Sequence, residues 1–438
     1  IGGTLIFNNH FIEGEMISTG GSLFTLHSGA TLEINNPDGL RNANLGALRN
    51  FASYVQHPMA NYTFSGATNQ VMKLGIDSAL NNLTISSGAI VSTTESIIVN
   101  GSLSVSSGTF HLNHSLTLKG LAINTVGGTI TTGTHAELHY NNAIAIQNIP
   151  STITTLSKLT LNTIINSTIN LDSPLSVTGF SGFKLMNGKL NTNAHSLTLL
   201  SDQPVIGYAN SYVIGNLKIQ AETFSETHNE NIFFPIGSSN YQPLGITVST
   251  PTNSGPVLIS AKVYESKPIG TADKITIGDS LYNRYWNLKT ESILNVFDLD
   301  RIEVSPTNTI PSISSQSKIA LSSNNSATSF NGIPSNLIGS TLLSSSSIAT
   351  NFLTDLLSSY GLFIGIGNGA LNAGTYCVGP SATYSPPSGP NYMNASSPYS
   401  SIHQALNDIA LKGQSGPVIL ELQQDYNGSL EPTPLNIT

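Results

Sequence analysis

Short strings of alternating apolar and polar residues recur along the first half of the chain, separated by small polar turns. Between residues 81 and 130 the strings place apolar side chains on one face and Ser or Thr on the other, as in Leu83-Thr84-Ile85. This period of two residues is typical of β-strands. Three turn glycines recur at equal steps of 20 residues: Gly88, Gly108 and Gly128. Such a constant step predicts the stacked coils of a β-solenoid.

The recurrence of short alternating segments predicts an all-β chain, and a change in their length predicts that the fold changes along it. We expect residues 1–205 to form a β-solenoid, a right-handed parallel β-helix, with an inserted loop near residues 37–60. The loop is predicted because Pro37-Asp38-Gly39 breaks the alternation. In residues 206–370 the strings become longer and richer in aromatic residues, which predicts a β-sandwich.

Residues 371–438 are expected to form a third part. A glycine-rich linker opens it, and residues 400–412 follow as an amphipathic helix with a serine cap and a glycine stop. The helix leads into the apolar strand Val418–Leu422. An amphipathic helix before a new series of strands is suited to cover the open end of a solenoid. We therefore expect a capping helix and the first strands of a second, truncated β-helix.

The amino-acid composition argues against some classes of binding partner, such as nucleic acids. Charged residues make up 9% of the chain, against about 25% in an ordinary soluble domain. The polar surface must therefore come from Ser, Thr and Asn, whose hydroxyl and amide groups can form ladders along stacked strands. The net charge is −8 and no basic run occurs, which argues against nucleic-acid binding. No apolar run approaches the roughly 20 residues that span a bilayer, so we do not expect the chain to cross a membrane.

The single cysteine, Cys377, allows no disulfide within the chain. We therefore expect the stability of the fold to come from the stacking of strands and not from covalent links.

Several longer strings resemble a large group of secreted and surface proteins of the Bacteroidota. The strings VNGSLSVSSG and HSLTL are similar to its β-helical repeats, and FPIG followed by YQPL, together with RYW, to the sandwich module that follows them. Residues 376–380 with residues 402–422 are similar to the opening of the next right-handed β-helix. The resemblance implies export by the type IX route and a place on the cell surface or outside the cell, as in long adhesins, gliding-associated proteins and filaments.

The same resemblance implies two modification sites. Members of this group are often O-glycosylated at Asp-Ser or Asp-Thr followed by a small or apolar residue. Asp77-Ser78-Ala79 and Asp279-Ser280-Leu281 fit this pattern. Ser78 and Ser280 are therefore the candidate glycosylated residues.

One segment carries residues that suit a metal site. In an extended strand His135, Glu137 and His139 lie on the same face and form a set of two histidines and one carboxylate. The alternative is that Ala136, Leu138 and Tyr140 face the core and the polar three face water. We assign no catalytic residue and expect no cofactor.

The sequence favours a structural role over chemistry. We expect the rod of a large adhesin or the subunit of an extracellular filament, in contact with other copies of itself, with adjoining domains of a longer chain, or with surface glycans. The first alternative is a carbohydrate-binding module with Tyr208, Tyr212, Tyr241 and Tyr264 as candidates. The second is a polysaccharide-degrading β-helix enzyme, which would need several carboxylates on one face.

Overall fold

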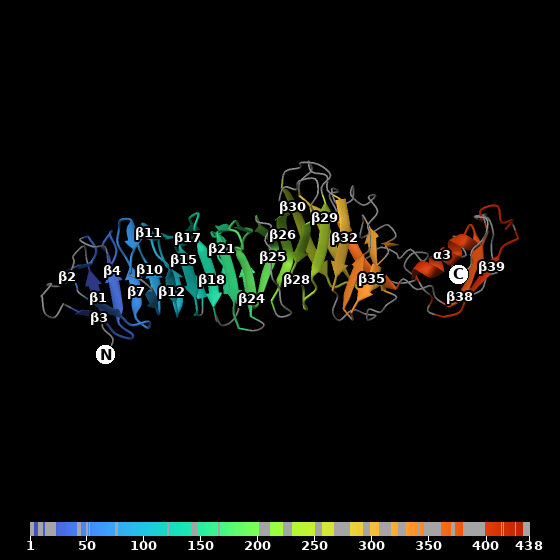
Figure 1. Cartoon of the computed structure of the whole chain (residues 1–438). Coiled ribbons are helices and arrows are strands. Elements are labelled where there is room, and N and C mark those ends of the chain that lie inside the picture. The colour runs from blue at the N-terminus through green and yellow to red at the C-terminus, as the bar shows by residue number, and fades with distance from the viewer. Residues whose placement is uncertain are drawn as a thin grey trace. The chain divides into compact units, whose positions relative to one another are not determined.

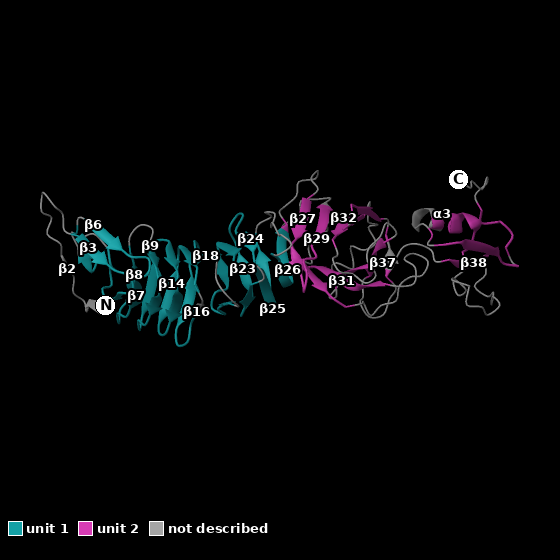
Figure 2. Cartoon of the chain, turned by 90° about the horizontal axis from the view of Figure 1, so that it is seen from below, with its two compact units in different colours: residues 1–220 teal, residues 221–438 magenta. Residues whose placement is uncertain are grey.

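The computed structural model is nearly all β, with short strands that pair side by side (Figure 1). The chain divides into two compact units, residues 1–220 and residues 221–438, which are coloured separately in Figure 2. The structure describes residues 4–7, 12–13, 23–41, 45–49, 51, 53–74, 78–120, 122–141, 147–164, 167–200, 211–221, 230–249, 256–266, 281–291, 298–305, 317–322, 330–333, 335–339, 341–345, 361–368, 373–379, 399–412, 414, 416–424 and 426–431.

Three parallel sheets of the first unit form the faces of a β-solenoid, and successive strands visit the three sheets in turn. The first sheet contains β1 (Thr4–Phe7), β4 (Thr31–Ile34), β7 (Asn61–Phe64), β10 (Leu83–Ile85), β13 (Ser102–Val105) and β16 (Ala122–Asn124). The second contains β8 (Gln70–Met72), β11 (Ile90–Thr93), β14 (Thr109–Leu112) and β17 (Thr129–Thr132). The third contains β9 (Ser78–Leu80), β12 (Ile97–Val99), β15 (Ser115–Leu118), β18 (Glu137–Asn141), β21 (Lys158–Asn162) and β24 (Phe183–Asn187). One circuit through the three sheets is one coil.

The register of the first sheet confirms the repeat that the sequence predicts. Leu83 pairs with Leu103, and Leu103 pairs with Ile123, so residues 20 positions apart lie directly above one another. Leu83 and Leu103 are fully buried, while Thr84 between the inward residues is half-buried. The period of two therefore sends each apolar side chain into the solenoid core and each small polar one to the outer face.

A further set of parallel strands continues the solenoid toward residue 220. Its strands are β19 (Gln147–Ile149), β20 (Thr155–Leu156), β22 (Thr168–Leu171), β23 (Leu175–Val177), β25 (Lys189–Leu199) and β26 (Val213–Ala221). The pair Leu199 and Ile219 still follows the parallel register. The solenoid pairing thus extends past the boundary expected at residue 205, because the longer apolar string of β26 fits the same ladder.

The loop expected near residues 37–60 is not a loop throughout, because the structure places strands in this segment. The segment contains two strands that pair in parallel with earlier strands, β5 with β2 and β6 with β3. The four strands are β2 (Ile12–Glu13), β3 (Leu23–Leu26), β5 (Leu48–Arg49) and β6 (Ser53–Gln56). Strand β6 could not be predicted from the sequence because its apolar residue Val55 faces outward and is 48% exposed. Without a buried apolar position in every second place, the period-two signal is lost.

The second unit begins with two sets of antiparallel strands. One contains β27 (Glu230–Phe234), β29 (Leu244–Ser249), β32 (Asp298–Val304), β36 (Leu342–Ser345) and β35 (Ser335–Ile338). The other contains β30 (Val257–Tyr264), β31 (Leu281–Thr290), β37 (Leu362–Asn368), β33 (Ser317–Ser322) and β34 (Asn331–Gly332). The short strand β28 (Ile236–Gly237) lies between β27 and β29 in the chain.

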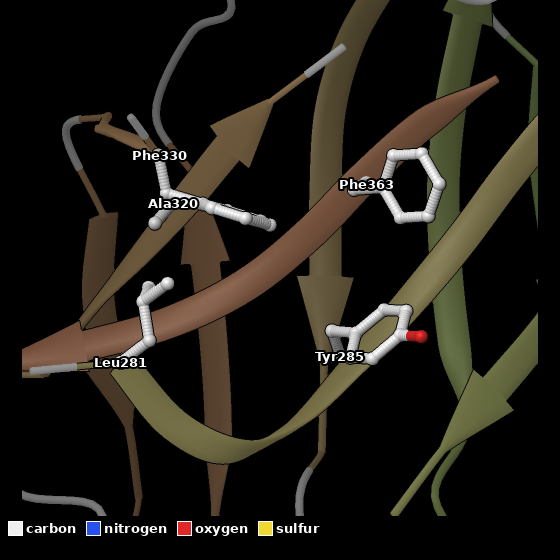
Figure 3. Packing of buried hydrophobic residues seen from close by; sticks show 5 residues of the cluster. All are labelled: Leu281, Tyr285, Ala320, Phe330 and Phe363. Atoms are coloured by element: carbon white, nitrogen blue, oxygen red, sulfur yellow. The ribbon is translucent and has the colours of Figure 1, made fainter. Parts of the chain in front are cut away.

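Buried aromatic residues form much of the core of this unit. One cluster contains Leu281, Tyr285, Ala320, Phe330 and Phe363 (Figure 3). Trp286 of β31 is fully buried, and its indole Nε1 donates a hydrogen bond of 3.1 Å to the carbonyl oxygen of Gln242, which precedes β29. This bond ties β31 to the segment before β29, and the sandwich fold expected for residues 206–370 stays a prediction.

The C-terminal part contains a helix between two parallel strands. Helix α3 (Ile402–Lys412) connects β38 (Gly374–Val378) and β39 (Val418–Leu422), which pair in parallel. Ala405 of the helix packs with Tyr376 and Val378 of β38. The predicted helix at 400–412 is confirmed with a start two residues later, because Ser400 and Ser401 precede the first turn. Its role as the cap of a second β-helix stays a prediction.

We expect the substitution Ser401→Ala to loosen the first turn of α3. The Ser401 hydroxyl accepts a hydrogen bond of 3.0 Å from the backbone N–H of Gln404, which a helix start otherwise leaves unpaired. Loss of such a cap costs about 0.5–2 kcal/mol. Hydrogen exchange of the peptide covering residues 402–412 should become faster, whereas exchange in the solenoid should not change. Unchanged exchange in the helix would contradict this account of the cap.

Candidate functional site

The candidate metal residues lie on the outer face of the third sheet. In β18 the buried positions are Leu138 and Tyr140, and Ala136 just before the strand is also fully buried. Glu137 and His139 alternate with them and are half-buried on the outer side. The alternation therefore places the apolar residues in the core and the polar ones at the surface, as one of the two sequence interpretations requires.

Glu137 is the centre of a small charged cluster. Its Oε1 lies 2.9 Å from Nζ of Lys158, and its Oε2 lies 3.2 Å from Nε2 of His139. Lys158 is directly opposite Glu137 in the parallel pairing of β18 with β21. Burial raises the pKa of the Glu137 carboxyl, but the hydrogen bonds from Lys158 and His139 outweigh it and lower the pKa below its ordinary value. The carboxylate is therefore ionised at neutral pH.

The structure does not assemble the predicted set of three metal ligands. His135 is exposed, and its Nδ1 lies 3.1 Å from the hydroxyl of its neighbour Thr134. Lys158 occupies the position beside Glu137 that a cation would take. Within the described residues no group of three or more His, Cys, Asp or Glu side chains could hold a metal ion. His135 does not join Glu137 and His139 because it precedes β18, and the pleat of the strand therefore does not fix its side chain on their face.

Sequence reasoning missed Lys158 as a partner of Glu137. The two residues are 21 positions apart in the sequence. Their separation is close to the 20-residue step of the coils, and this spacing is the signal that could have found the pair. On a solenoid, residues one coil apart are neighbours across strands.

Asparagine ladders join successive coils, as the composition predicted, and one of them runs along the outer face of the third sheet. The amide Nδ2 of Asn187 donates to Oδ1 of Asn162 at 3.0 Å, and Nδ2 of Asn162 donates to Oδ1 of Asn141 at 3.1 Å. A second ladder, on the neighbouring sheet of β19, β22 and β25, joins Asn191, Asn170 and Asn148. The middle amide of the first ladder, Asn162, both donates and accepts, so the ladder links three coils without charge repulsion.

The remaining candidates of the sequence are two serines and four tyrosines. Ser78 is the first residue of β9, and the structure does not describe its side chain. Ser280 and Tyr208 lie outside the described residues. Tyr212 is fully buried, which removes it from any exposed groove. Tyr264 is half-buried and stacks on Tyr285 with ring centroids 4.7 Å apart. Burial raises the pKa of Tyr241 to about 12.

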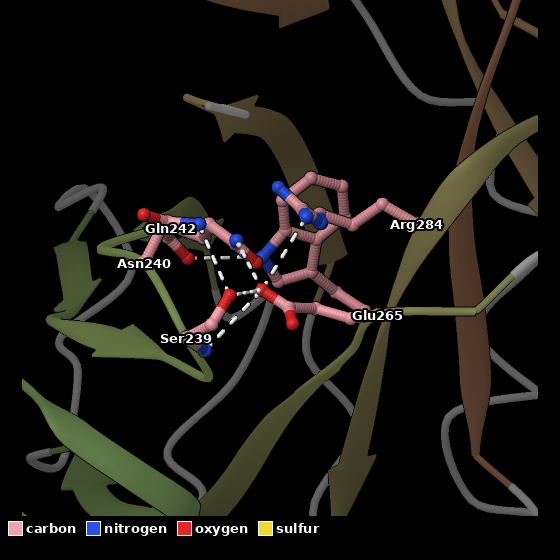
Figure 4. Close-up of polar contacts among 6 residues, drawn as sticks. Ser239, Asn240, Gln242, Glu265 and Arg284 are labelled. Atoms are coloured by element: carbon pink, nitrogen blue, oxygen red, sulfur yellow. Dashed lines mark hydrogen bonds and ion pairs between the residues drawn. The ribbon is translucent and has the colours of Figure 1, made fainter. Parts of the chain in front are cut away.

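A second polar cluster surrounds Glu265, directly after β30 (Figure 4). The carboxylate Oε1 accepts hydrogen bonds from the backbone N–H of Ser239 at 3.2 Å and from Nε2 of Gln242 at 3.2 Å. It also lies 3.4 Å from Nη2 of Arg284, whose side chain is only 4% exposed. The motifs YQPL and RYW, noted for the family resemblance, thus converge at one carboxylate. We interpret this cluster as structural because the carboxylate satisfies the donors around it.

We expect acid to weaken the second unit through Glu265. Burial raises the pKa of this carboxyl, but hydrogen bonds from Ser238, Ser239 and Gln242 and the charge of Arg284 outweigh burial and lower the pKa below its ordinary value. A lowered folded-state pKa means that the stabilisation is complete above the unfolded pKa of about 4.3 and is lost as the pH falls through the folded pKa.

The variant Glu265→Gln should therefore lose about 1–2 kcal/mol of unfolding free energy at pH 7 and little below pH 3, since charged hydrogen bonds contribute about 1.5–3 kcal/mol when well buried and this side chain is partly exposed. Urea unfolding of both proteins at the two pH values checks this. An equal loss at pH 7 and at pH 3 would show that ionisation is not the cause.

No helix in the described part of the chain is long and apolar enough to cross a membrane. Comparisons with known proteins gave no match to a family model, to a curated protein or to a solved structure.

Proposed function

We propose that this chain is a structural segment of an extracellular cell-surface protein, either the rod of a large adhesin or the subunit of an extracellular filament. The observation that carries the proposal is the parallel solenoid of residues 4–219, with coils in register and amide ladders along its outer face. Coils that contact only their neighbours add stability along the stack, which makes a solenoid a stiff spacer.

The proposal extends to the location of the protein. Export by the type IX route and display on a Bacteroidota cell follow from the resemblance of its repeat, FPIG, YQPL and RYW strings to such proteins. The low content of charged residues and the Ser, Thr and Asn face suit lateral contact with copies of itself or with adjoining domains.

The two alternative functions, a carbohydrate-binding module and a polysaccharide-degrading enzyme, have less support than the structural role. A carbohydrate-binding module would need exposed aromatic residues, and Tyr212 is buried while Tyr264 is covered on one side by Tyr285. A polysaccharide-degrading enzyme would need several carboxylates on one face. Among the described outer positions of β15, β18, β21 and β24, Glu137 is the single carboxylate.

Immunogold electron microscopy of intact cells tests the proposal. An antiserum raised against residues 1–220 should label material outside the cell, along rods or filaments. Cells from which the gene has been deleted are the control for specificity. Label confined to the interior of sectioned cells would overturn the proposal.

A further inference from the structure

The outer face of the third sheet concentrates positive charge on an acidic protein. We call this surface the lysine face and define it by the outward side chains of β15, β18, β21 and β24 together with Lys119, which directly follows β15. Its lysines come from three different coils: Lys119, Lys158 and Lys184. Lys119 and Lys184 are exposed, and the side chain of Lys158 is 41% exposed.

The charges of the lysine face do not cancel. Its three lysines stand against one carboxylate, Glu137, which pairs with Lys158. Neither Lys119 nor Lys184 forms an ion pair with any residue that the structure describes. The whole chain carries a net charge of −8, so this local excess of positive charge runs against the character of the protein.

Neutral hydrogen-bonding groups lie beside the lysines in regular rows. Thr117 and Thr160 flank His139 in the register of the three strands. The ladder of Asn141, Asn162 and Asn187 runs along one side of this row. Hydroxyl and amide groups of this kind are suited to the hydroxyls of a sugar, and they repeat once per coil.

We propose that the lysine face binds a linear polysaccharide that carries carboxylate or sulfate groups. Neighbouring strands lie about 4.8 Å apart, which is close to the length of one sugar unit in an extended polysaccharide. A chain lying along the stack would therefore present successive sugars to successive coils. Lysines supply the attraction to the acidic groups, and the Thr and Asn side chains supply hydrogen bonds to hydroxyls.

This inference is independent of whether the solenoid is a stalk or a filament subunit. A flat anionic lipid surface would use the lysines but would not match the once-per-coil spacing of the hydroxyl and amide rows. The ordered rows of neutral groups therefore favour a polysaccharide over a membrane.

The test uses the full chain and polygalacturonate as the probe, with binding measured by isothermal titration calorimetry at low salt. The triple variant Lys119→Gln, Lys158→Gln and Lys184→Gln removes the positive charges of the face. Since an exposed ion pair contributes only a small free energy, we expect about ten-fold weaker binding by this variant. The matched control removes three lysines elsewhere: Lys73→Gln, Lys262→Gln and Lys289→Gln. The control should bind within about two-fold of the native chain, because its lysine face is intact.

A variant with the opposite expected sign sharpens the test. Glu137→Gln removes the one carboxylate of the face and releases Lys158, so we expect about two- to five-fold tighter binding of polygalacturonate. Neutral dextran should not bind. The proposal is overturned if the native chain does not bind polygalacturonate, if both triple variants lose affinity equally, or if vesicles of anionic lipid bind as tightly as polygalacturonate and with the same dependence on the three lysines.

Discussion

Replacing Gly108 with alanine is expected to destabilise the solenoid, although the change adds a single methyl group. Gly108 has a φ of +66°, a backbone conformation that residues with a Cβ atom rarely adopt. An added Cβ would also lie 2.2 Å from the carbonyl oxygen of Ser87 and 2.5 Å from that of Ala89, both in the preceding coil. The conformation alone costs about 1–3 kcal/mol, and the close approach to the neighbouring backbone adds to it.

The matched control is Gly88→Ala, in the same Ser-Ser-Gly string one repeat earlier. Gly88 does not have a positive φ, and an added Cβ would meet no atom within 4 Å. This variant should keep the native stability to within about 0.5 kcal/mol, as surface substitutions usually do. Thermal unfolding followed by circular dichroism compares the two variants. Equal effects of the two substitutions would contradict the tight stacking of coils at Gly108.

Replacing Trp286 with alanine should have the largest effect in the second unit. The indole is fully buried, and truncation of such a side chain costs about 3–5 kcal/mol through lost burial and the cavity left behind. The substitution also leaves the buried carbonyl of Gln242 without the indole N–H, at a further cost of about 1–3 kcal/mol. Hydrogen exchange should become faster in β29 and β31, whereas exchange in β10 to β15 should stay as it is.

Trp286→Phe is the control that separates the two causes. It keeps most of the apolar volume but removes the hydrogen bond to Gln242. We expect its loss of unfolding free energy to be smaller than that of Trp286→Ala. If Trp286→Ala changed exchange in the solenoid as much as in β29 and β31, the assignment of this core to the second unit would be wrong.

The sequence predicts the solenoid well because its signal is local and repeated. Each coil contains buried apolar residues in every second position, such as Leu83 and Leu103, and the register pairs them as the 20-residue step requires. The helix is predicted for the same kind of reason, since the Ser401 cap and the apolar face of α3 lie within one short segment.

Features that depend on distant parts of the chain are harder to predict. Strand β6 was hidden because its apolar Val55 faces outward. The partner of Glu137 is Lys158, which lies on the next coil and becomes a neighbour only once the register is known. The candidate ligand His135 shares the spacing of Glu137 and His139 but lies before β18 begins. Spacing along one strand therefore predicts which residues share a face and does not predict which of them make contact.

The most direct test of the structural role is electron microscopy of the native protein isolated from its source. The account predicts extended stiff particles, either filaments of subunits joined end to end with a regular axial repeat or single rods that end in a distinct tip. Compact particles without any rod or filament would contradict the proposal that this solenoid is a structural element.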